Sequence, residues 1–168
     1  MQPWGPHCIR MITAVRRLTG IACFLLLAAC GSSAFSIASP SVDASYTCPP
    51  GATNAPYELH ATADVDNPTS QSVDVRSVSA IMVLAAVQGA WQQKVGSEYD
   101  AGQVQFSPKT IGANSKAKLQ VTIRSACTNG PKPAATADSG DYTVKLTVTT
   151  SAGTFNLTST NKHRIQAG

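Results

Sequence analysis

Hydrophobic and polar positions alternate with a period of two over much of the chain from Tyr57 onward. Such alternation is typical of β-strands that bury one face. The clearest stretches cover residues 57–66, 117–124 and 142–149. Their apolar members are Tyr57, Leu59, Ala61, Ala63, Val65, Ala117, Leu119, Val121, Ile123, Tyr142, Val144, Leu146 and Val148. We predict a strand at each stretch, with one face in the core.

Less regular segments predict further strands. A strand that begins at Val73 runs into residues 80–87, which are apolar on both faces and fit a central strand covered on both sides; a short helix is the alternative. Residues 88–102 have no clear period and predict a loop with at most a short strand. Residues 104–106 predict a short strand, and residues 155–157 the second arm of a hairpin. The chain therefore predicts an all-β fold, an antiparallel sandwich of about six or seven strands.

The amino-terminal segment has the order of an export signal. Arg16 and Arg17 precede an apolar run at residues 21–29. That run is about half as long as the roughly 20 apolar residues that a membrane-spanning helix needs. Residues 1–10 are atypical of such a signal, so we take Met11 as the candidate true start.

The end of this segment, Leu27-Ala28-Ala29-Cys30, resembles the lipobox of bacterial lipoproteins. The resemblance implies cleavage before Cys30 and diacylglycerol on its sulfur, with further acylation of the new amino terminus as an option. It also implies an anchor in the bacterial cell membrane or outer membrane, with the domain facing outside the cytoplasm. An ordinary secretory signal with a chance cysteine is the alternative.

Composition divides the chain at the same place. Residues 1–29 form the expected signal peptide, and residues 30–56, rich in Ser, Ala, Pro and Gly, the expected flexible tether before a β-sandwich domain at residues 57–168. Three of the 13 basic residues and none of the nine acidic ones precede Cys30, so the net charge after it is 10 − 9 = +1. A nearly neutral domain offers little attraction to phosphate backbones, so we expect no nucleic-acid partner.

Cysteine positions predict one disulfide. Two of the five cysteines fall in the signal and Cys30 takes the lipid, which leaves Cys48 and Cys127. Outside the cytoplasm such a pair is expected to be oxidised. A metal pair or a catalytic cysteine is the alternative, but His60 and His163 are isolated in the sequence and no C-x-x-C is present. We expect no metal and no cofactor.

A second resemblance concerns Asp138-Ser139-Gly140-Asp141-Tyr142, which is similar to the D-x-G-x-Y corner of immunoglobulin-like domains. The resemblance implies an immunoglobulin-like sandwich in which the tyrosine hydroxyl bonds backbone a few residues upstream. An immunoglobulin domain proper has a cysteine two residues after the tyrosine, where this chain has Val144. The inter-sheet disulfide of antibody domains is therefore absent.

Acidic and basic clusters offer candidate chemistry, each with a simpler explanation. The oxygen-rich set Asp64, Asp66, Asn67 and Asp74 could hold calcium, but a solvated strand edge with turn caps is the more common arrangement. Glu98 and Asp100 could serve a glycosidase, although both lie in one loop. Lys116, Lys118 and Arg124 share one outward face, which favours protection of a strand edge and, as the second interpretation, a contact to an acidic polymer.

Aromatic residues in the loop at residues 88–102 are the candidate ligand contacts. Trp91 and Tyr99 could stack on a sugar or a partner, whereas a buried core tryptophan is the alternative. We predict a non-catalytic binding or adhesion module that meets an envelope protein or glycan. A structural lipoprotein without a ligand of its own is the second hypothesis. An enzyme is the third and is disfavoured, because no recognised nucleophile arrangement is present.

Overall fold

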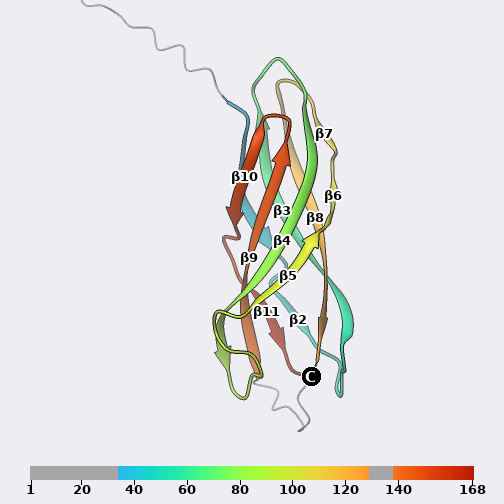
Figure 1. Ribbon diagram of the computed structural model, residues 1–168, viewed down its shortest axis with the longest axis vertical. Helices are drawn as coiled ribbons and strands as arrows, with labels where there is room; N and C mark the ends of the chain where they lie inside the picture. Colours follow the sequence, from blue (N-terminus) through green and yellow to red (C-terminus); the bar gives the residue numbers. More distant parts are fainter. Residues whose placement is uncertain (1–33, 129–137) are drawn as a thin grey trace, which may run out of the picture. The chain divides into compact units, whose positions relative to one another are not determined.

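The computed structural model describes residues 34–128 and 138–168, and strands are the only regular elements in that part of the chain (Figure 1). In chain order they are β1 (Ser36–Val42), β2 (Ser45–Thr47), β3 (Ala55–Asn67), β4 (Val73–Gln88), β5 (Glu98–Gln103), β6 (Gln105–Ser107), β7 (Thr110–Ile111), β8 (Ser115–Cys127), β9 (Ser139–Thr150), β10 (Gly153–Thr158) and β11 (His163–Gln166). A search of the described residues for an apolar helix of bilayer-spanning length finds none.

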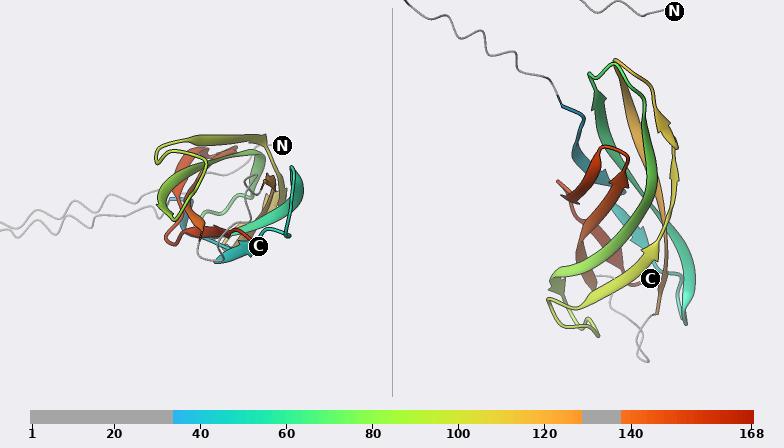
Figure 2. Two further views of the ribbon diagram at one scale, coloured as in Figure 1. Left: turned by 90° about the horizontal axis from the view of Figure 1, so that it is seen from below. Right: turned by 45° about the horizontal axis from the view of Figure 1, so that its top comes forward.

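The predicted all-β, immunoglobulin-like sandwich is confirmed. One sheet has four strands in the order β1-β3-β8-β6, and the other has seven, with β2-β11-β9-β4-β5 as its path, β10 beside β9 and β7 beside β4. The pairs between described strands are antiparallel, except that β2 runs parallel to β11. Seen from below, strands of both sheets surround a common interior (Figure 2), which one hydrophobic core fills.

The alternating stretches form the centre of both sheets. The predicted apolar faces of β3, β8 and β9 are buried, with Leu59, Leu119 and Val144 fully inaccessible. The apolar run at residues 80–87 is part of β4, not a helix, and β4 lies between β9 and β5. Only one of its faces is fully covered, since Ile81 and Val83 on the other face stay partly exposed.

The expected tether at residues 30–56 is wrong for most of its length. Two strands, β1 and β2, lie inside it, and Phe35, Ile37 and Val42 contribute to the core. These few large apolar side chains are separated by small and polar residues, so the average composition of the segment conceals them. With β7 and β11, which have two and four residues, β1 and β2 raise the number of strands to 11 within residues 34–128 and 138–168.

Consecutive described strands lie in different sheets at seven connections, and two of these connections, from β1 to β2 and from β5 to β6, are called here the first and the second crossing. At the first crossing β1, in the four-stranded sheet, leads through Asp43 and Ala44 into β2 of the seven-stranded sheet. At the second crossing β5 continues through Val104 into β6 of the four-stranded sheet (Figure 1). The backbone N–H of Val104 donates to the carbonyl of Val78 at 2.9 Å, which keeps this residue against β4. Each crossing ties one sheet to the other along a side of the sandwich.

Candidate functional site

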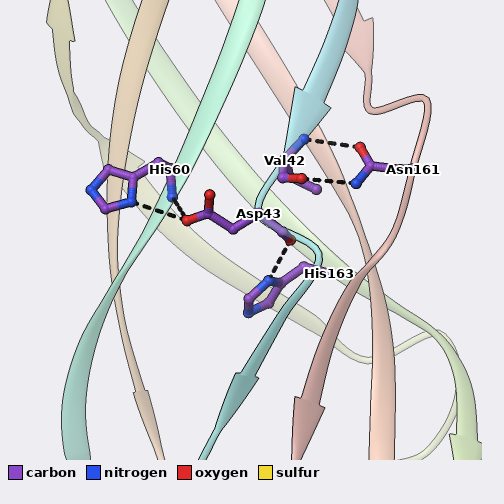
Figure 3. Close-up of polar contacts among 5 residues, drawn as sticks. All are labelled: Val42, Asp43, His60, Asn161 and His163. Carbon is purple, nitrogen blue, oxygen red and sulfur yellow. Dashed lines mark hydrogen bonds and ion pairs between the residues drawn. The ribbon is translucent and has the colours of Figure 1, made fainter.

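Asp43, at the first crossing, is held by two histidines from different sheets (Figure 3). Its carboxylate Oδ2 accepts the backbone N–H of His60 at 2.8 Å and lies 3.0 Å from His60 Nδ1. Its own N–H donates to the His60 carbonyl at 3.0 Å. His60 belongs to β3, so these contacts fix the crossing to the four-stranded sheet. We call Val42, Asp43, His60, Asn161 and His163 the Asp43 junction.

His163 binds the other side of the same residue. Its Nδ1 donates to the backbone carbonyl of Asp43 at 2.8 Å, and its side chain lies in the core between the sheets, stacked on Tyr57 at 5.9 Å between ring centroids. A carbonyl can only accept, so Nδ1 carries the proton and Nε2 of the neutral ring has none. Nε2 is buried without a partner among the described residues. Burial lowers the pKa of His163, although the Asp43 carbonyl opposes this, and the ring is therefore held neutral.

Asn161 completes the junction by acting as a strand partner for Val42. Its Oδ1 accepts the Val42 N–H at 2.9 Å and its Nδ2 donates to the Val42 carbonyl at 2.8 Å (Figure 3). The preceding Thr160 donates from both its N–H and its hydroxyl to the Pro40 carbonyl, at 2.8 and 3.0 Å. The segment between β10 and β11 thus leaves β9 and covers the outer edge of β1.

The Asp43 junction was not foreseen from the sequence, where His60 and His163 looked isolated. The structure brings both to Asp43, but to opposite sides, through its carboxylate and its carbonyl. Among the described residues no hydroxyl or thiol bonds His60 Nε2, and no group of three or more His, Cys, Asp or Glu is placed to hold a metal ion. The contacts therefore fix a strand crossing. A predicted disulfide at Cys48 was the available signal that this segment is folded.

Trp91 packs into the fold. Its ring lies so close to Gly140 that a Cβ there would stand 2.7 Å from the indole, and its Nε1 donates to the Tyr142 hydroxyl at 3.3 Å. The Tyr142 hydroxyl in turn donates to Gln93 Oε1. The expected tyrosine corner differs in its bonding, because among the described residues this hydroxyl bonds Trp91 and Gln93 of the loop between β4 and β5 and no backbone a few residues upstream. Burial raises the pKa of Tyr142, against the lowering effect of the Trp91 hydrogen bond.

Tyr99 faces outward, unlike Trp91. It is 42% exposed on β5, and its hydroxyl donates to the Arg124 carbonyl of β8 at 3.1 Å. The other large hydrophobic residues that are exposed in the described ranges are Val87, at 44%, and Val95, at 58%. All three belong to the β4–β5 hairpin, which spans residues 73–103, and the first and last of them flank the loop that joins its strands. In the described ranges, the exposed large hydrophobic side chains are therefore confined to this hairpin.

The acidic candidates for calcium are engaged in other contacts. Asp64 lies 2.7 Å from Lys118 Nζ and Asp66 lies 3.1 Å from Lys116 Nζ, each pair directly opposite across β3 and β8. Asn67 is fully buried. These residues form cross-strand pairs and a turn cap.

Asn67 and Asp74 show the capping role in detail. The Asn67 amide donates at 2.8 Å to the carbonyls of both Gln71 and Gly112, which ties the β3–β4 turn to the residue after β7. Asp74 Oδ1 accepts the Thr110 hydroxyl at 2.9 Å and thereby links β4 to β7. The carboxylate and amide oxygens are thus used inside the fold.

The basic residues of β8 lie at positions where one side of the strand is unpaired. Lys116 and Lys118 pair with the aspartates opposite them, and Arg124 Nε lies 3.9 Å from Glu58 Oε1. β6 pairs only with residues 120–122 of β8, so no described strand pairs with the other side of β8 at these three residues, which is where edge protection is expected. Each of the three is also within ion-pair distance of an acidic residue on β3.

Glu98 and Asp100, the carboxylates considered for a glycosidase, each contact a residue of the fold. Glu98 Oε1 lies 3.5 Å from Lys145 Nζ, and Asp100 Oδ1 accepts the N–H of Gly102 at 2.8 Å.

Cys48 and Cys127 form the predicted disulfide, with 6.1 Å between their Cα atoms. Cys48 directly follows β2 and Cys127 ends β8, so the bond joins the two sheets at one end of the sandwich. Cys30 and the expected signal peptide lie outside the described residues.

Comparison with known proteins yields no family. No protein-family model and no curated protein matches the chain. Similar solved structures include an ASH/PapD-like domain of human CEP192, 16% identical, with a TM-score of 0.37 over 97% of this chain and 98% of that one. A late embryogenesis abundant protein is 18% identical, with a TM-score of 0.37 over 78% and 71% of the two chains. The CooA pilin subunit of enterotoxigenic Escherichia coli is 12% identical, with a TM-score of 0.33 over 78% and 99%. At these values no activity is transferred to the chain.

Proposed function

We propose that the protein is a bacterial lipoprotein, anchored through Cys30, whose non-catalytic sandwich binds a protein or glycan of the cell envelope. The observation that carries the binding role is that Val87, Val95 and Tyr99, the exposed large hydrophobic residues of the described ranges, all belong to the β4–β5 hairpin. Monomeric domains seldom concentrate their exposed large apolar side chains, and such places are frequently interaction sites. Trp91 supports the loop from within and is not part of the contact surface.

The disulfide and the short spacing after Cys30 support the proposed location. A Cys48–Cys127 bond is typical of proteins that fold outside the reducing cytoplasm. Phe35, five residues after Cys30, is already part of the core. At about 3.5 Å per extended residue, the anchor would hold the domain within roughly 20 Å of the bilayer surface. Partners are therefore expected at the membrane and not at a distance from it.

Two experiments test the two parts of the proposal separately. Metabolic labelling with an alkyne fatty acid should mark the wild-type chain, and Cys30→Ala should abolish both the label and membrane association. An unlabelled wild-type chain would exclude the lipid anchor.

For the binding role, a photo-crosslinking amino acid at Val95 should capture one envelope component in living cells. The same group at exposed Ala113, in the loop between β7 and β8, is the matched control. Val95→Ser should weaken capture from a neighbouring crosslinker at Lys94 without loss of folding. Equal capture at positions 95 and 113 would contradict a binding surface on the hairpin.

A further inference from the structure

The outer edge of β10 is an unpaired strand edge. β10 pairs with β9 on one side, and no described strand pairs with its other side (Figure 1). In an antiparallel pair every second residue directs its N–H and C=O away from the partner strand. Among the described residues, the backbone of β10 receives no hydrogen bond on that outer side. The edge is therefore free to accept another strand.

Other edges of the two sheets carry features that discourage pairing. β2 has three residues and is followed by Pro49 and Pro50; β6 also has three and is followed by Pro108. β5 carries two carboxylates and pairs with β4 through a register shift, and β7 has two residues. Val42 on the edge of β1 is occupied by Asn161. Short strands, prolines, charges and bulges are the usual protections of a sheet edge.

β10 has none of these protections. Its six residues, Gly-Thr-Phe-Asn-Leu-Thr, include no proline and no charge, and they pair with β9 without a register shift. Phe155 is held in place by an edge-to-face contact with Phe35, 5.5 Å between ring centroids. Phe155 and Leu157 face the core side and remain partly exposed, while Thr154, Asn156 and Thr158 are exposed on the outer side.

The order of these residues is symmetric about Asn156. In an antiparallel pair of two β10 strands centred there, Thr154 stands opposite Thr158 of the second copy, Phe155 opposite Leu157, and Asn156 opposite Asn156. Aromatic–aliphatic pairs and threonine pairs across strands are favourable, and no like charges meet. A two-fold interface requires such self-complementarity, because the same patch is used on both copies.

We infer that two copies of this chain associate through antiparallel pairing of their β10 strands about Asn156. The seven-stranded sheets of the two copies then form one continuous sheet across the two-fold axis. The occupant of the edge is a second copy, because the sequence of β10 matches itself. This inference does not depend on the lipid anchor or on the β4–β5 hairpin.

A charge-swap experiment tests it on the chain from Ser32 to Gly168, which contains the whole described core and the disulfide. Sedimentation velocity should show the wild type in a reversible monomer–dimer equilibrium. Asn156→Lys and Asn156→Asp should each raise the dimer dissociation constant several-fold at low salt, since two like charges then meet at the axis, and less at high salt. Mixing the two variants should restore the dimer.

Asn156→Thr is the matched control. Like Asn156→Lys, it loses the hydrogen bond that Asn156 Oδ1 accepts from the Thr147 hydroxyl at 3.1 Å, but it adds no charge. This variant should therefore dimerise like the wild type. Circular dichroism of every variant should match the wild type because Asn156 is exposed. A wild type that stays monomeric at millimolar concentration, or a dimer indifferent to Asn156→Lys, would overturn the inference.

Discussion

The first crossing, from β1 to β2, and the second, from β5 to β6, are held by different kinds of contact. At the first crossing the backbone N–H and the ring of His60 in β3 bind the Asp43 carboxylate, and the side chains of Asn161 and His163 bind the backbone of Val42 and Asp43. At Val104 one backbone hydrogen bond to β4 holds the chain, and just before it β5 contains a bulge in which Gly102 has a φ of 61° and its N–H is bound by Asp100. At this bulge the pairing of β5 with β4 shifts register between Ala80 and Ile81.

Sequence distance explains the difference. The second crossing ends a hairpin whose strands are neighbours in the chain, so local backbone conformation can direct it. The first crossing depends on residues 43, 60 and 163, which chain folding must bring together from far apart. Long-range ordering costs more conformational entropy than a local turn. Polar side-chain contacts and a disulfide offset that cost on the first side only.

Removing the disulfide, which secures the first crossing, should cause the largest loss in the free energy of unfolding. Cys48→Ser with Cys127→Ser frees a loop of 79 residues in sequence separation, and the chain-entropy model gives a loss of about 4–5 kcal/mol in the free energy of unfolding. Urea denaturation of the double variant and of the reduced wild type should agree. A loss below about 1 kcal/mol would show that the first crossing is fixed without covalent help.

Asn161→Ala should cause the second-largest loss in the free energy of unfolding. It removes both hydrogen bonds to Val42 and leaves a partly buried N–H and carbonyl at the edge of β1, at a cost of about 1–3 kcal/mol. Asn156→Thr, on an exposed strand face, is the control. Asn114→Ala is unsuitable because Asn114 has a positive φ of 50°. If the two variants had the same free energy of unfolding, the Asn161 hydrogen bonds would not stabilise the junction.

The long strands could be predicted because alternation is a local pattern, and the disulfide because only two cysteines are available to pair. β3, β8 and β9 contain the alternating stretches 57–66, 117–124 and 142–149, and two cysteines allow one pairing. The Asp43 junction could not be predicted in this way, since its partners have no fixed spacing. The motif ending at Tyr142 forms the start of β9, but its hydroxyl bonds Trp91 and Gln93, which lie in a loop without periodicity.

Gly102→Ala tests the second crossing and should cost about 1–2 kcal/mol. A positive φ of 61° is unfavourable for a residue with a Cβ, although no atom lies within 4 Å of the position that a Cβ would occupy. The loss therefore reports backbone strain alone, and Gly102→Asn should recover part of it because Asn tolerates this region better. Equal losses for Ala and Asn would show that the turn does not depend on left-handed backbone.

The smallest expected effect is a pH dependence confined to the first crossing. His163 titrates near pH 6.5 in the unfolded chain, and its folded pKa lies lower because the ring is buried. Between these values the unfolded state binds a proton that the folded state does not, so stability is complete above about pH 7 and falls as the pH drops through 6.5. One proton limits the slope to about 1.4 kcal/mol per pH unit.

Urea denaturation between pH 7 and pH 5 measures this slope. The pKa of the neighbouring Asp141 is held below its usual value by Arg164, which donates to it at 2.6 Å, so this pair keeps its charges over the range. His163→Asn should flatten the profile because its amide can still donate to the Asp43 carbonyl but cannot titrate. His60→Gln, at the exposed side of the same junction, should leave the slope in place. A slope that disappears with His60 instead would assign the pH response to the carboxylate side of Asp43 and not to the buried ring.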